Sequence, residues 1–325
     1  MSVFRPSWFS NETVMVSTAP TCGLTKGGRL LFKVDSTTGK PMQTIDPDTG
    51  APIEAIDDQL LADMEALSNG EQTDTLQLLN SKEIDIHCAV PVYYDNRFTE
   101  SFREEMLKNP TFQGFFSATL SDLQKMGIIE LRNGHGSPSH AQRTGEVPYI
   151  KVSDLRAGLV NINPTNRVPS SVAEHFWKGP TSRLQPFDLI CPERTSKNIG
   201  DFCVLMPGQE QVVTTKEVIV LRPGPKAEFD AFYLLWAMTL NIVRNQWKRI
   251  VFMQTNREDV GKRYLEIEIP VAPTKDQAYE ISNEFRNYFT TMAMARISLG
   301  EYLASSGAHH FFVSGDEPDE NPTPT

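Results

Sequence analysis

The sequence is poor in cysteine and has no long hydrophobic run. Its four cysteines, Cys22, Cys88, Cys191 and Cys203, form no C-x-x-C pair, which argues against a disulfide scaffold or a zinc ribbon and favours a reducing compartment. No stretch of about 18 apolar residues occurs, and the N-terminus lacks a basic segment followed by an apolar one. We therefore expect neither secretion nor a membrane span, and we predict a cytoplasmic protein.

Motifs that carry catalysis are also missing. The glycines of TKGGR (25–29) are typical of a hairpin tip and not of a cofactor loop that follows a first strand. Transfer of a methyl group to adenine would need an Asn/Asp-Pro-Pro-aromatic loop, and the nearest match, NPTF (109–112), lacks the second proline. A nuclease would combine Asp188 with Glu-x-Lys, but Thr195 replaces the lysine after Glu193. We predict no catalytic residue, no metal site and no cofactor.

Positive charge is scarce overall but unevenly distributed. The chain has 31 Lys and Arg against 41 Asp and Glu, a formal net charge of −10. Residues 120–270 hold 19 basic and 16 acidic residues, and residues 244–263 alone hold six basic and two acidic ones. Phosphate binding depends on local charge, so this distribution leaves nucleic-acid binding open. A solvated basic face would show the same pattern.

The order of apolar and turn-forming residues predicts a chain of both strands and helices. Short apolar runs between residues 128 and 225, separated by Gly, Pro and Asn, predict strands. Further elements predicted from apolar spacing and caps are helices at 57–68, 99–108, 120–127 and 228–250 and a strand at 263–271. In GEVPYIKVSDLRAG (145–158), Pro148 is not expected at a central position of a sheet, because proline has no N–H to donate to a neighbouring strand.

The C-terminal part predicts a long helix. TKDQ (274–277) fits a capping box that starts it. Apolar residues then follow at alternating steps of three and four: Ala278, Ile281, Phe285, Tyr288, Met292, Ala295, Leu299 and Tyr302. Such a heptad pattern favours pairing with another helix, although packing against the helix's own domain stays an alternative. We predict a partner surface at Ile281, Phe285, Tyr288, Met292 and Leu299, followed by an acidic, Pro-rich, disordered tail.

The middle of the chain resembles one protein family. TLSDLQKMG (119–127) followed by GEVPYIKVSDLRAGLV (145–160) is similar to the start of the target recognition domain of type I restriction–modification specificity subunits. Further family landmarks follow in the same order: LQPFDLICPERTSKNIGDFCVL (184–205), EVIVLRPG (217–224), FDAFYLLWAMT (229–239) and YLEIEIPVAPTKDQAYEI (264–281). The resemblance covers about residues 119–303 and departs from the family at Phe187, where a glycine is usual.

The N-terminal part is similar to something else. APTCGLTKGGRLLFKVDSTTGKP (19–41), followed by IDDQL (56–60), resembles the C-terminal tail of type I adenine methyltransferase subunits. Together the two resemblances imply five parts: a methyltransferase-tail-like hairpin region and linker (1–75), a bridging segment (76–118), a DNA target recognition domain (119–273), a coiled-coil-type helix (274–305) and a disordered acidic tail (306–325). The implied fold class is α+β, a mixed-β recognition domain with packed helices followed by a long heptad helix.

The resemblance implies a non-catalytic module that binds double-stranded DNA at a half-site and docks an adenine DNA methyltransferase subunit. A restriction or translocase subunit is a further candidate partner, S-adenosylmethionine is expected only on the methyltransferase, and we predict a homodimer through the C-terminal helix. Candidate base or backbone contacts are Arg194, Lys197, Asn198, Gln254, Asn256 and Arg257, and candidate phosphate contacts are Arg143, Lys151, Lys248 and Arg249. An interaction or regulatory protein without DNA recognition remains an alternative, as does a nuclease or methyltransferase fragment.

Overall fold

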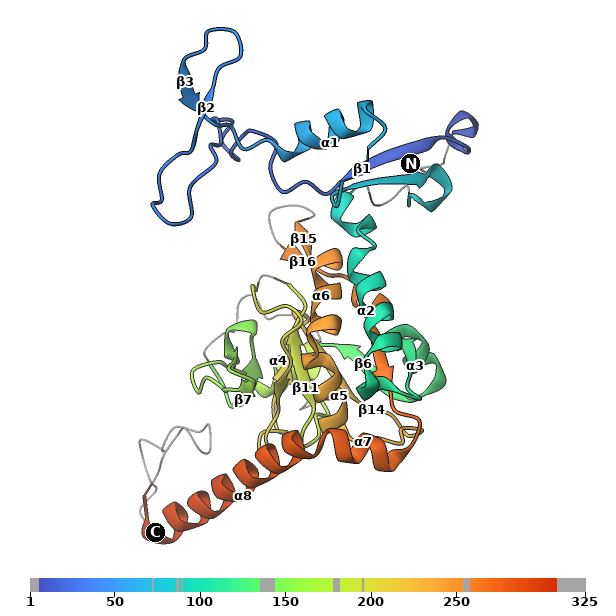
Figure 1. Ribbon diagram of the computed structural model, residues 1–325. Helices are drawn as coiled ribbons and strands as arrows, with labels where there is room; N and C mark the ends of the chain where they lie inside the picture. Colours follow the sequence, from blue (N-terminus) through green and yellow to red (C-terminus); the bar gives the residue numbers. More distant parts are fainter. Residues whose placement is uncertain are drawn as a thin grey trace. The chain divides into compact units, whose positions relative to one another are not determined.

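The chain forms two compact units, Met1–Asn96 and Arg97–Thr325. The computed structural model (Figure 1) describes residues 6–71, 73–85, 88, 90–134, 144–177, 182–194, 196–253 and 258–308. The division at Asn96 falls inside the bridging segment expected at 76–118. The fold class is α+β, as predicted, with mixed sheets, packed helices and a long C-terminal helix. No helix among the described residues has the length and apolar character needed to cross a bilayer.

The first unit is built on one strand pair and one helix. Strand β1 (Thr13–Ser17) runs antiparallel to β4 (Leu76–Asn80), and α1 (Gln59–Ser68) precedes β4. The helix predicted at 57–68 is confirmed, and the Asp58 side chain accepts the Leu61 N–H at its start. Short 3₁₀ turns complete the unit: η1 (Ser7–Phe9), η2 (Ser81–Glu83) and η3 (Pro91–Tyr94).

Residues 22–58 of the first unit form an arm that is held together by backbone hydrogen bonds. It includes the antiparallel pair β2 (Gln43–Ile45) and β3 (Pro52–Glu54) and several backbone bonds between its other turns. Many large apolar side chains of the arm and of α1 are exposed: Leu24, Leu30, Val34, Met42, Ile45, Ile53, Ile56, Leu61, Met64 and Leu67. The buried apolar cluster, in contrast, consists of Val16, Leu79 and Tyr94. So small a core stabilises a unit of this size only weakly.

Asp63 is the buried polar centre of the first unit. Its carboxylate accepts hydrogen bonds from the hydroxyls of Ser17 and Thr73 at 2.5 Å and of Thr75 at 2.7 Å. Thr73 and Thr75, at the end of the predicted hairpin region and linker (1–75), are thus bound to the buried carboxylate of α1. Buried Asp63 is satisfied by these hydroxyl donors, as a buried carboxylate requires.

A six-stranded sheet is the centre of the second unit. Its strand order is β6-β14-β11-β12-β9-β8, and only the β12–β9 pair is parallel. The strands are β6 (Ile129–Asn133), β14 (Val218–Pro223), β11 (Leu189–Pro192), β12 (Cys203–Val204), β9 (Leu159–Val160) and β8 (Leu155–Arg156). Ala157 and Gly158, with φ of 52° and 75°, form the two-residue turn between β8 and β9. Two positive φ values match the twist of a tight hairpin.

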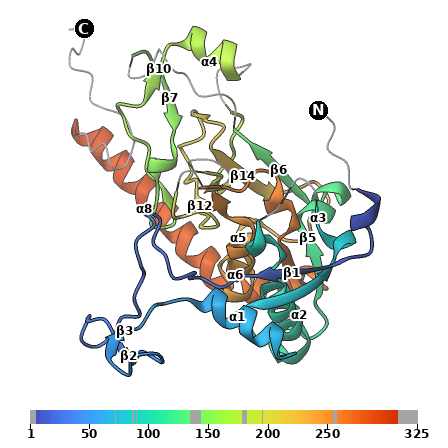
Figure 2. The same cartoon turned by 90° about the horizontal axis from the view of Figure 1, so that it is seen from above.

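A smaller three-stranded sheet carries the segment around Pro148. Its order is β10 (Arg167–Val168), β7 (Val147–Ile150) and β13 (Val213–Thr214), and α4 (Ser170–Trp177) follows β10. Strand β7 is the middle strand, but β10 pairs with Val147 and Pro148 whereas β13 pairs with Tyr149 and Ile150. Pro148 therefore has a partner strand on one side only, so the restriction predicted for this residue holds although the strand is central. Figure 2 shows this sheet on the opposite side of the unit from α2 and α3.

Helices cover one face of the six-stranded sheet. Leu189, Cys191, Ile219 and Leu221 point to this face and share a core with α5 (Ala231–Thr239) and α6 (Asn241–Ile250). Around them lie α2 (Arg97–Lys108), α3 (Leu120–Met126), the turn η4 (Pro110–Phe112) and the pair β5 (Phe116–Thr119) with β17 (Glu268–Val271). The other face packs against Ile150, Leu155, Leu184 and Leu205 of a second cluster. The sheet is thus buried on both faces.

Three predicted element boundaries are corrected. The single helix expected at 228–250 is two helices that meet at Leu240, where ψ is 131°, and the Thr239 hydroxyl donates to the Trp236 carbonyl at the end of α5. This break lets both α5 and α6 bury aromatic side chains in one core. The helix expected at 99–108 already begins at Arg97. The strand expected at 263–271 is the turn η6 (Arg263–Glu266) followed by β17.

The predicted C-terminal helix is present but broken at Ser282. Thr274 accepts the Gln277 N–H as the predicted N-cap, α7 (Lys275–Ile281) follows, and α8 (Asn283–Ser306) continues in a new direction (Figure 1). The buried Ser282 hydroxyl donates to the Ala278 carbonyl at 2.7 Å and so competes with the helical backbone. Arg286 binds Asp230 at 2.7 Å, which fastens the start of α8 to α5. The expected disordered tail lies outside the described residues from position 309 on.

The two cysteines of the sheet give a test of this core. Cys191 and Cys203 are buried, and burial raises the pKa of Cys191 and raises that of Cys203 to about 11. We expect Ellman's reagent near pH 8 to modify exposed Cys22 rapidly, and Cys191 and Cys203 only after denaturation. Peptide mapping of the labelled native protein measures this, with Cys22→Ser as the control. Rapid native labelling of Cys191 would contradict the buried sheet.

Candidate nucleic-acid interface

Residues 133 and 192, where two segments with candidate contact residues begin (133–143 and 192–198), lie at the same end of the six-stranded sheet. In the strand register, Pro192 of β11 faces Val218 of β14, and Asn133 of β6 faces Ile219. The ladder continues beyond these ends, because the Glu193 N–H donates to the Glu217 carbonyl at 2.8 Å. The loops that begin at residues 133 and 192 therefore leave neighbouring positions of one rigid framework.

The third predicted loop returns to the same place. It belongs to the hairpin of β15 (Phe252–Met253) and β16 (Glu258–Asp259). Directly after this hairpin the Val260 N–H donates to the Glu193 carbonyl at 3.2 Å, and the Tyr264 hydroxyl donates to Asn133 Oδ1 at 2.9 Å. The structure thus brings together the bases of loops 133–143, 192–198 and 252–259, which are far apart in the sequence. Arg143, Gln254, Asn256 and Arg257 lie outside the described residues.

The loop after β11 contains three of the predicted contact residues. The Arg194 guanidinium binds the carboxylate of buried Glu193 at 2.9 Å, so much of its charge is already balanced. Lys197 and Asn198 are exposed, and a serine hydroxyl accepts the Asn198 N–H. The loop ends at Gly200, where φ is 90° and a β-carbon would lie 2.9 Å from the Trp247 ring. Lys197 and Asn198 are therefore held on a fixed turn and open to a ligand.

The predicted phosphate contacts have unequal surroundings. Lys248 is exposed on α6, with its ammonium 5.6 Å from the centre of the Phe98 ring, and Lys151 lies 5.0 Å from the Tyr149 ring. Arg249 binds Glu266 at 2.7 Å and is largely buried. A contact with an aromatic ring does not neutralise the charge of a lysine. The charge of Arg249, in contrast, is balanced by the carboxylate of Glu266. Lys248 is the best placed of these three for an external anion.

A cluster of arginines at the edge of the sheet was not predicted from the sequence. Arg132 on β6 and Arg222 on β14 both donate to the carbonyl oxygen of Arg183, at 3.0 Å and 3.1 Å. Arg222 also binds the buried carboxylate of Asp188 at 2.6 Å. Each arginine is isolated in the sequence, so no local pattern marks the cluster. A signal was present only in the predicted strands, since Arg132 and Arg222 interrupt otherwise apolar runs.

Phe187, at the position where the resembling family usually has glycine, adopts a glycine-like backbone. Its φ is 65°, its N–H donates to the Leu205 carbonyl, and its ring centre lies 5.0 Å from that of Phe232. A left-handed conformation costs a non-glycine residue about 1–2 kcal/mol. The ring contact with α5 offsets this cost, so the departure preserves the local fold.

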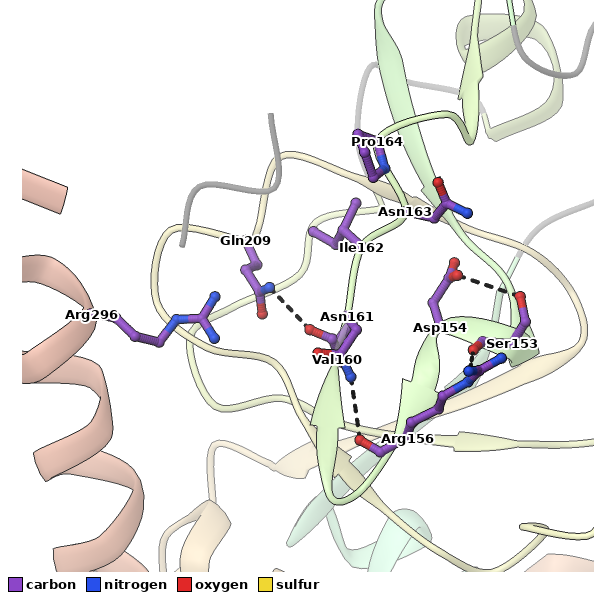
Figure 3. A pocket seen from close by; sticks show the side chains of 10 residues that line it. All are labelled: Ser153, Asp154, Arg156, Val160, Asn161, Ile162, Asn163, Pro164, Gln209 and Arg296. Carbon is purple, nitrogen blue, oxygen red and sulfur yellow. Dashed lines mark hydrogen bonds between the residues drawn. The ribbon is translucent and has the colours of Figure 1, made fainter. Parts of the chain in front are cut away.

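A pocket of about 570 Å³ opens between the β8–β9 hairpin and α8 (Figure 3). Asp154, in the turn after β7, accepts the Lys151 N–H at 2.8 Å and an Asn166 amide N–H at 3.3 Å, and burial raises its pKa. Gln209 is fixed between the Val160 carbonyl and the Met206 N–H. Asp154 thus stabilises the local fold through these hydrogen bonds. Within the described part of the chain, no cluster of three His, Cys, Asp or Glu could hold a metal ion.

Comparison with known proteins gives similar structures only. No family model matches the chain, and no curated protein matches it. A chain from a study of complex assembly and conformational transition in the type I R-M system is 15% identical with a TM-score of 0.36, covering 76% of this chain and 55% of that one. The HsdS subunit from Thermoanaerobacter tengcongensis is 15% identical with a TM-score of 0.35, covering 61% and 46%. The type I S subunit from M. genitalium is 12% identical with a TM-score of 0.35, covering 78% and 66%. The chain spans less than two thirds of each of these chains, and similarity at this level leaves its function to be argued from its own residues.

Proposed function

We propose that this chain is a non-catalytic DNA-specificity module of a restriction–modification or phage-defence methyltransferase system. It binds double-stranded DNA at a half-site and docks the methyltransferase subunit that carries S-adenosylmethionine. The supporting observation is the convergence of three polar loops at one end of the six-stranded sheet, joined at Asn133, Glu193 and Val260. A sheet buried on both faces is a rigid support, and loops on a rigid support suit recognition.

The residues at this end of the sheet are suited to two different kinds of DNA contact, one that positions the duplex and one that reads its sequence. Exposed Lys248 can contact phosphates, and exposed Lys197 and Asn198 can donate hydrogen bonds to base edges. Phosphate contacts supply salt-dependent affinity, whereas base contacts select the site. Residues in the loops can be substituted without loss of the hydrogen bonds at the loop bases. The DNA sequence that is recognised can therefore change while the sheet that supports the loops stays the same.

In the proposed complex, the first unit binds the catalytic subunit. Leu61, Met64 and Leu67 form an exposed apolar stripe along α1, while the same helix buries Asp63. Exposed apolar patches of this kind mark protein interaction surfaces. A methyltransferase subunit that covers this stripe would also strengthen a unit whose own core is small.

A selection experiment tests the DNA-binding proposal. The purified chain is incubated with a random-sequence duplex pool at two salt concentrations, and bound DNA is recovered, amplified and sequenced over several rounds. We expect one enriched motif and weaker binding at the higher salt. Absence of both enrichment and salt dependence would overturn the proposal. Binding of S-adenosylmethionine to the chain alone would instead favour a methyltransferase fragment.

The ion pairs around the loops favour a second candidate, an interaction or regulatory protein without DNA recognition. Arg194 is paired with Glu193, Arg244 with Asp201 and Arg249 with Glu266, which lowers the local positive field. Formally, the first unit adds further negative charge, with 14 acidic residues between positions 6 and 96 against five basic ones. Salt-independent association with a protein, together with no DNA binding, would support this candidate.

The proposal includes a homodimer formed through α8. Phe289 and Ala293 of this helix are buried against its own unit, whereas Tyr288, Leu299 and Tyr302 are 60%, 45% and 66% exposed. The exposed residues belong to the predicted heptad seam, whereas Ile281, Phe285 and Met292 of the same predicted seam pack against the core of their own unit. A second copy of the helix would cover the seam, and two copies related by a two-fold axis would present two half-sites.

A substitution in the seam tests the dimer. We expect Leu299→Glu to convert a micromolar dimer into a monomer, because a charge in an apolar helix seam would lose its water. Light scattering with and without DNA measures the mass. Met294→Glu is the matched control, since Met294 is 62% exposed and lies away from the seam. A wild-type monomer under both conditions would contradict the dimer.

A further inference from the structure

Arg132, Arg183 and Arg222, which we name the arginine cluster, lie around one buried carboxylate. Arg222 is 9% exposed and binds Asp188, which is 1% exposed, at 2.6 Å. Arg132 and Arg222 each donate to the carbonyl oxygen of Arg183. The strand register places both arginines on the face of the sheet that carries Val220, opposite the face covered by α5. Two guanidinium groups are thus held in place by one backbone oxygen.

Two carboxylates, Asp188 and Glu130, lie close to Arg132 and Arg222 of the arginine cluster. Asp188 neutralises Arg222, and Glu130, 4.0 Å from Arg222, is 56% exposed and therefore screened by water. In the described part of the chain, Arg132 has no carboxylate within ion-pair distance. Burial lowers the pKa of Arg132; the nearby charge of Arg222 and, to a smaller extent, that of Arg183 also lower it, while those of Asp188 and Glu130 raise it. A half-buried cation beside two others is a place where an anion would be strongly favoured.

We propose that the arginine cluster binds a phosphate group of the DNA backbone, with Arg132 as the contact residue and Arg222 as a positioning residue. This inference rests on the proposed function. A guanidinium offers two parallel N–H donors that match two phosphate oxygens, and the carbonyl of Arg183 occupies only one of the Arg132 donors. Arg222 cannot leave Asp188 without exposing a buried charge, so its role is to orient the Arg183 carbonyl and, through it, Arg132.

Position in the fold favours the DNA backbone over a free phosphate ion. Arg132 stands immediately before Asn133, where the first recognition loop begins and where Tyr264 ties in the third. A phosphate held at Arg132 would fix the duplex next to the loops that read it. Contacts of this kind set register without selecting sequence.

The test compares DNA affinity of the full chain and its variants by fluorescence anisotropy over a series of salt concentrations. We expect Arg132→Gln to weaken binding roughly tenfold on specific and random duplexes alike, and to reduce the slope of log K against log salt by about one. Arg132→Lys should keep the slope, because it keeps the charge. Lys125→Gln, which removes an exposed charge on α3, is the matched control and should match the wild type.

The outcomes separate this inference from the proposed function. If the wild type binds DNA and Arg132→Gln behaves like Lys125→Gln, the arginine cluster is not a phosphate site and the function stands. If the wild type binds no duplex, the proposed function fails, and titration with inorganic phosphate then follows. Phosphate binding that Arg132→Gln abolishes would replace the DNA backbone by a free ion as ligand. Should Arg132→Gln fail to fold, judged by its thermal unfolding, Arg132→Met, which keeps the aliphatic part of the side chain but removes the guanidinium, takes its place with the same expected result.

Discussion

Replacement of Asp188 by alanine lowers the free energy of unfolding of the second unit by about 3–5 kcal/mol. We expect this loss because Arg222 would keep its buried guanidinium without a counter-charge. Asp188 also accepts the Gln185 N–H at 2.9 Å, so the loop before β11 loses a bond as well. Chemical denaturation followed by tryptophan fluorescence measures the loss, since Trp236 and Trp247 are buried in this unit.

Two controls separate the buried charge from the loss of a side chain. The double variant Asp188→Leu, Arg222→Met removes both charges, and we expect it to recover most of the stability. Glu104→Ala removes an exposed carboxylate paired with Lys108 and should cost less than about 0.5 kcal/mol. An Asp188→Ala variant as stable as Glu104→Ala would show that the carboxylate does not compensate Arg222.

Gly134→Ala has the second largest expected effect, a loss of about 3 kcal/mol. A β-carbon at this position would overlap the carbonyl oxygen of Thr215 and lie 2.6 Å from its carbonyl carbon. The obstacle is backbone, which cannot rotate away as a flexible side chain can. The Gly134 N–H also donates to the Val218 carbonyl at 3.1 Å, so relief of the overlap would break the end of the β6–β14 ladder. Both the denaturation midpoint and DNA affinity should fall, because the first recognition loop begins here.

The control for Gly134 is a glycine with space around it. The nearest atom to a β-carbon on Gly27 would be the Thr25 hydroxyl oxygen at 4.0 Å, and its φ is not positive. Gly27→Ala should therefore leave stability within about 0.5 kcal/mol of the wild type. Equal denaturation midpoints for Gly134→Ala and Gly27→Ala would show that the Thr215 carbonyl does not lie against Gly134 at the end of the sheet.

Local features of the fold could be predicted from the sequence. Thr274 caps α7, as the TKDQ pattern predicted, and the helix predicted at 120–127 ends at Gly127 in the left-handed conformation. Capping and turn formation involve atoms within a few residues, so the sequence carries these signals directly. The breaks at Leu240 and Ser282 were not predicted, because apolar spacing continues across both while the tertiary core requires a change of direction.

The candidate site was predictable only in part. Polar composition marked the loops, and the structure shows that the described bases of these loops meet. Composition could not show that Arg194 and Arg249 are already paired with Glu193 and Glu266, because those pairs depend on packing.

By itself, the sequence determined the mixture of strands and helices, the caps and the tight turns, all of which depend on short-range order. Only the tertiary structure decided which distant residues meet. Arg132 lies 51 residues before Arg183 in the sequence, and Arg222 lies 39 residues after it. The carbonyl oxygen of Arg183 nevertheless accepts a hydrogen bond from each of these two arginines. Contacts over such separations arise from strand pairing and burial of the whole sheet, and they leave no periodic pattern along the chain.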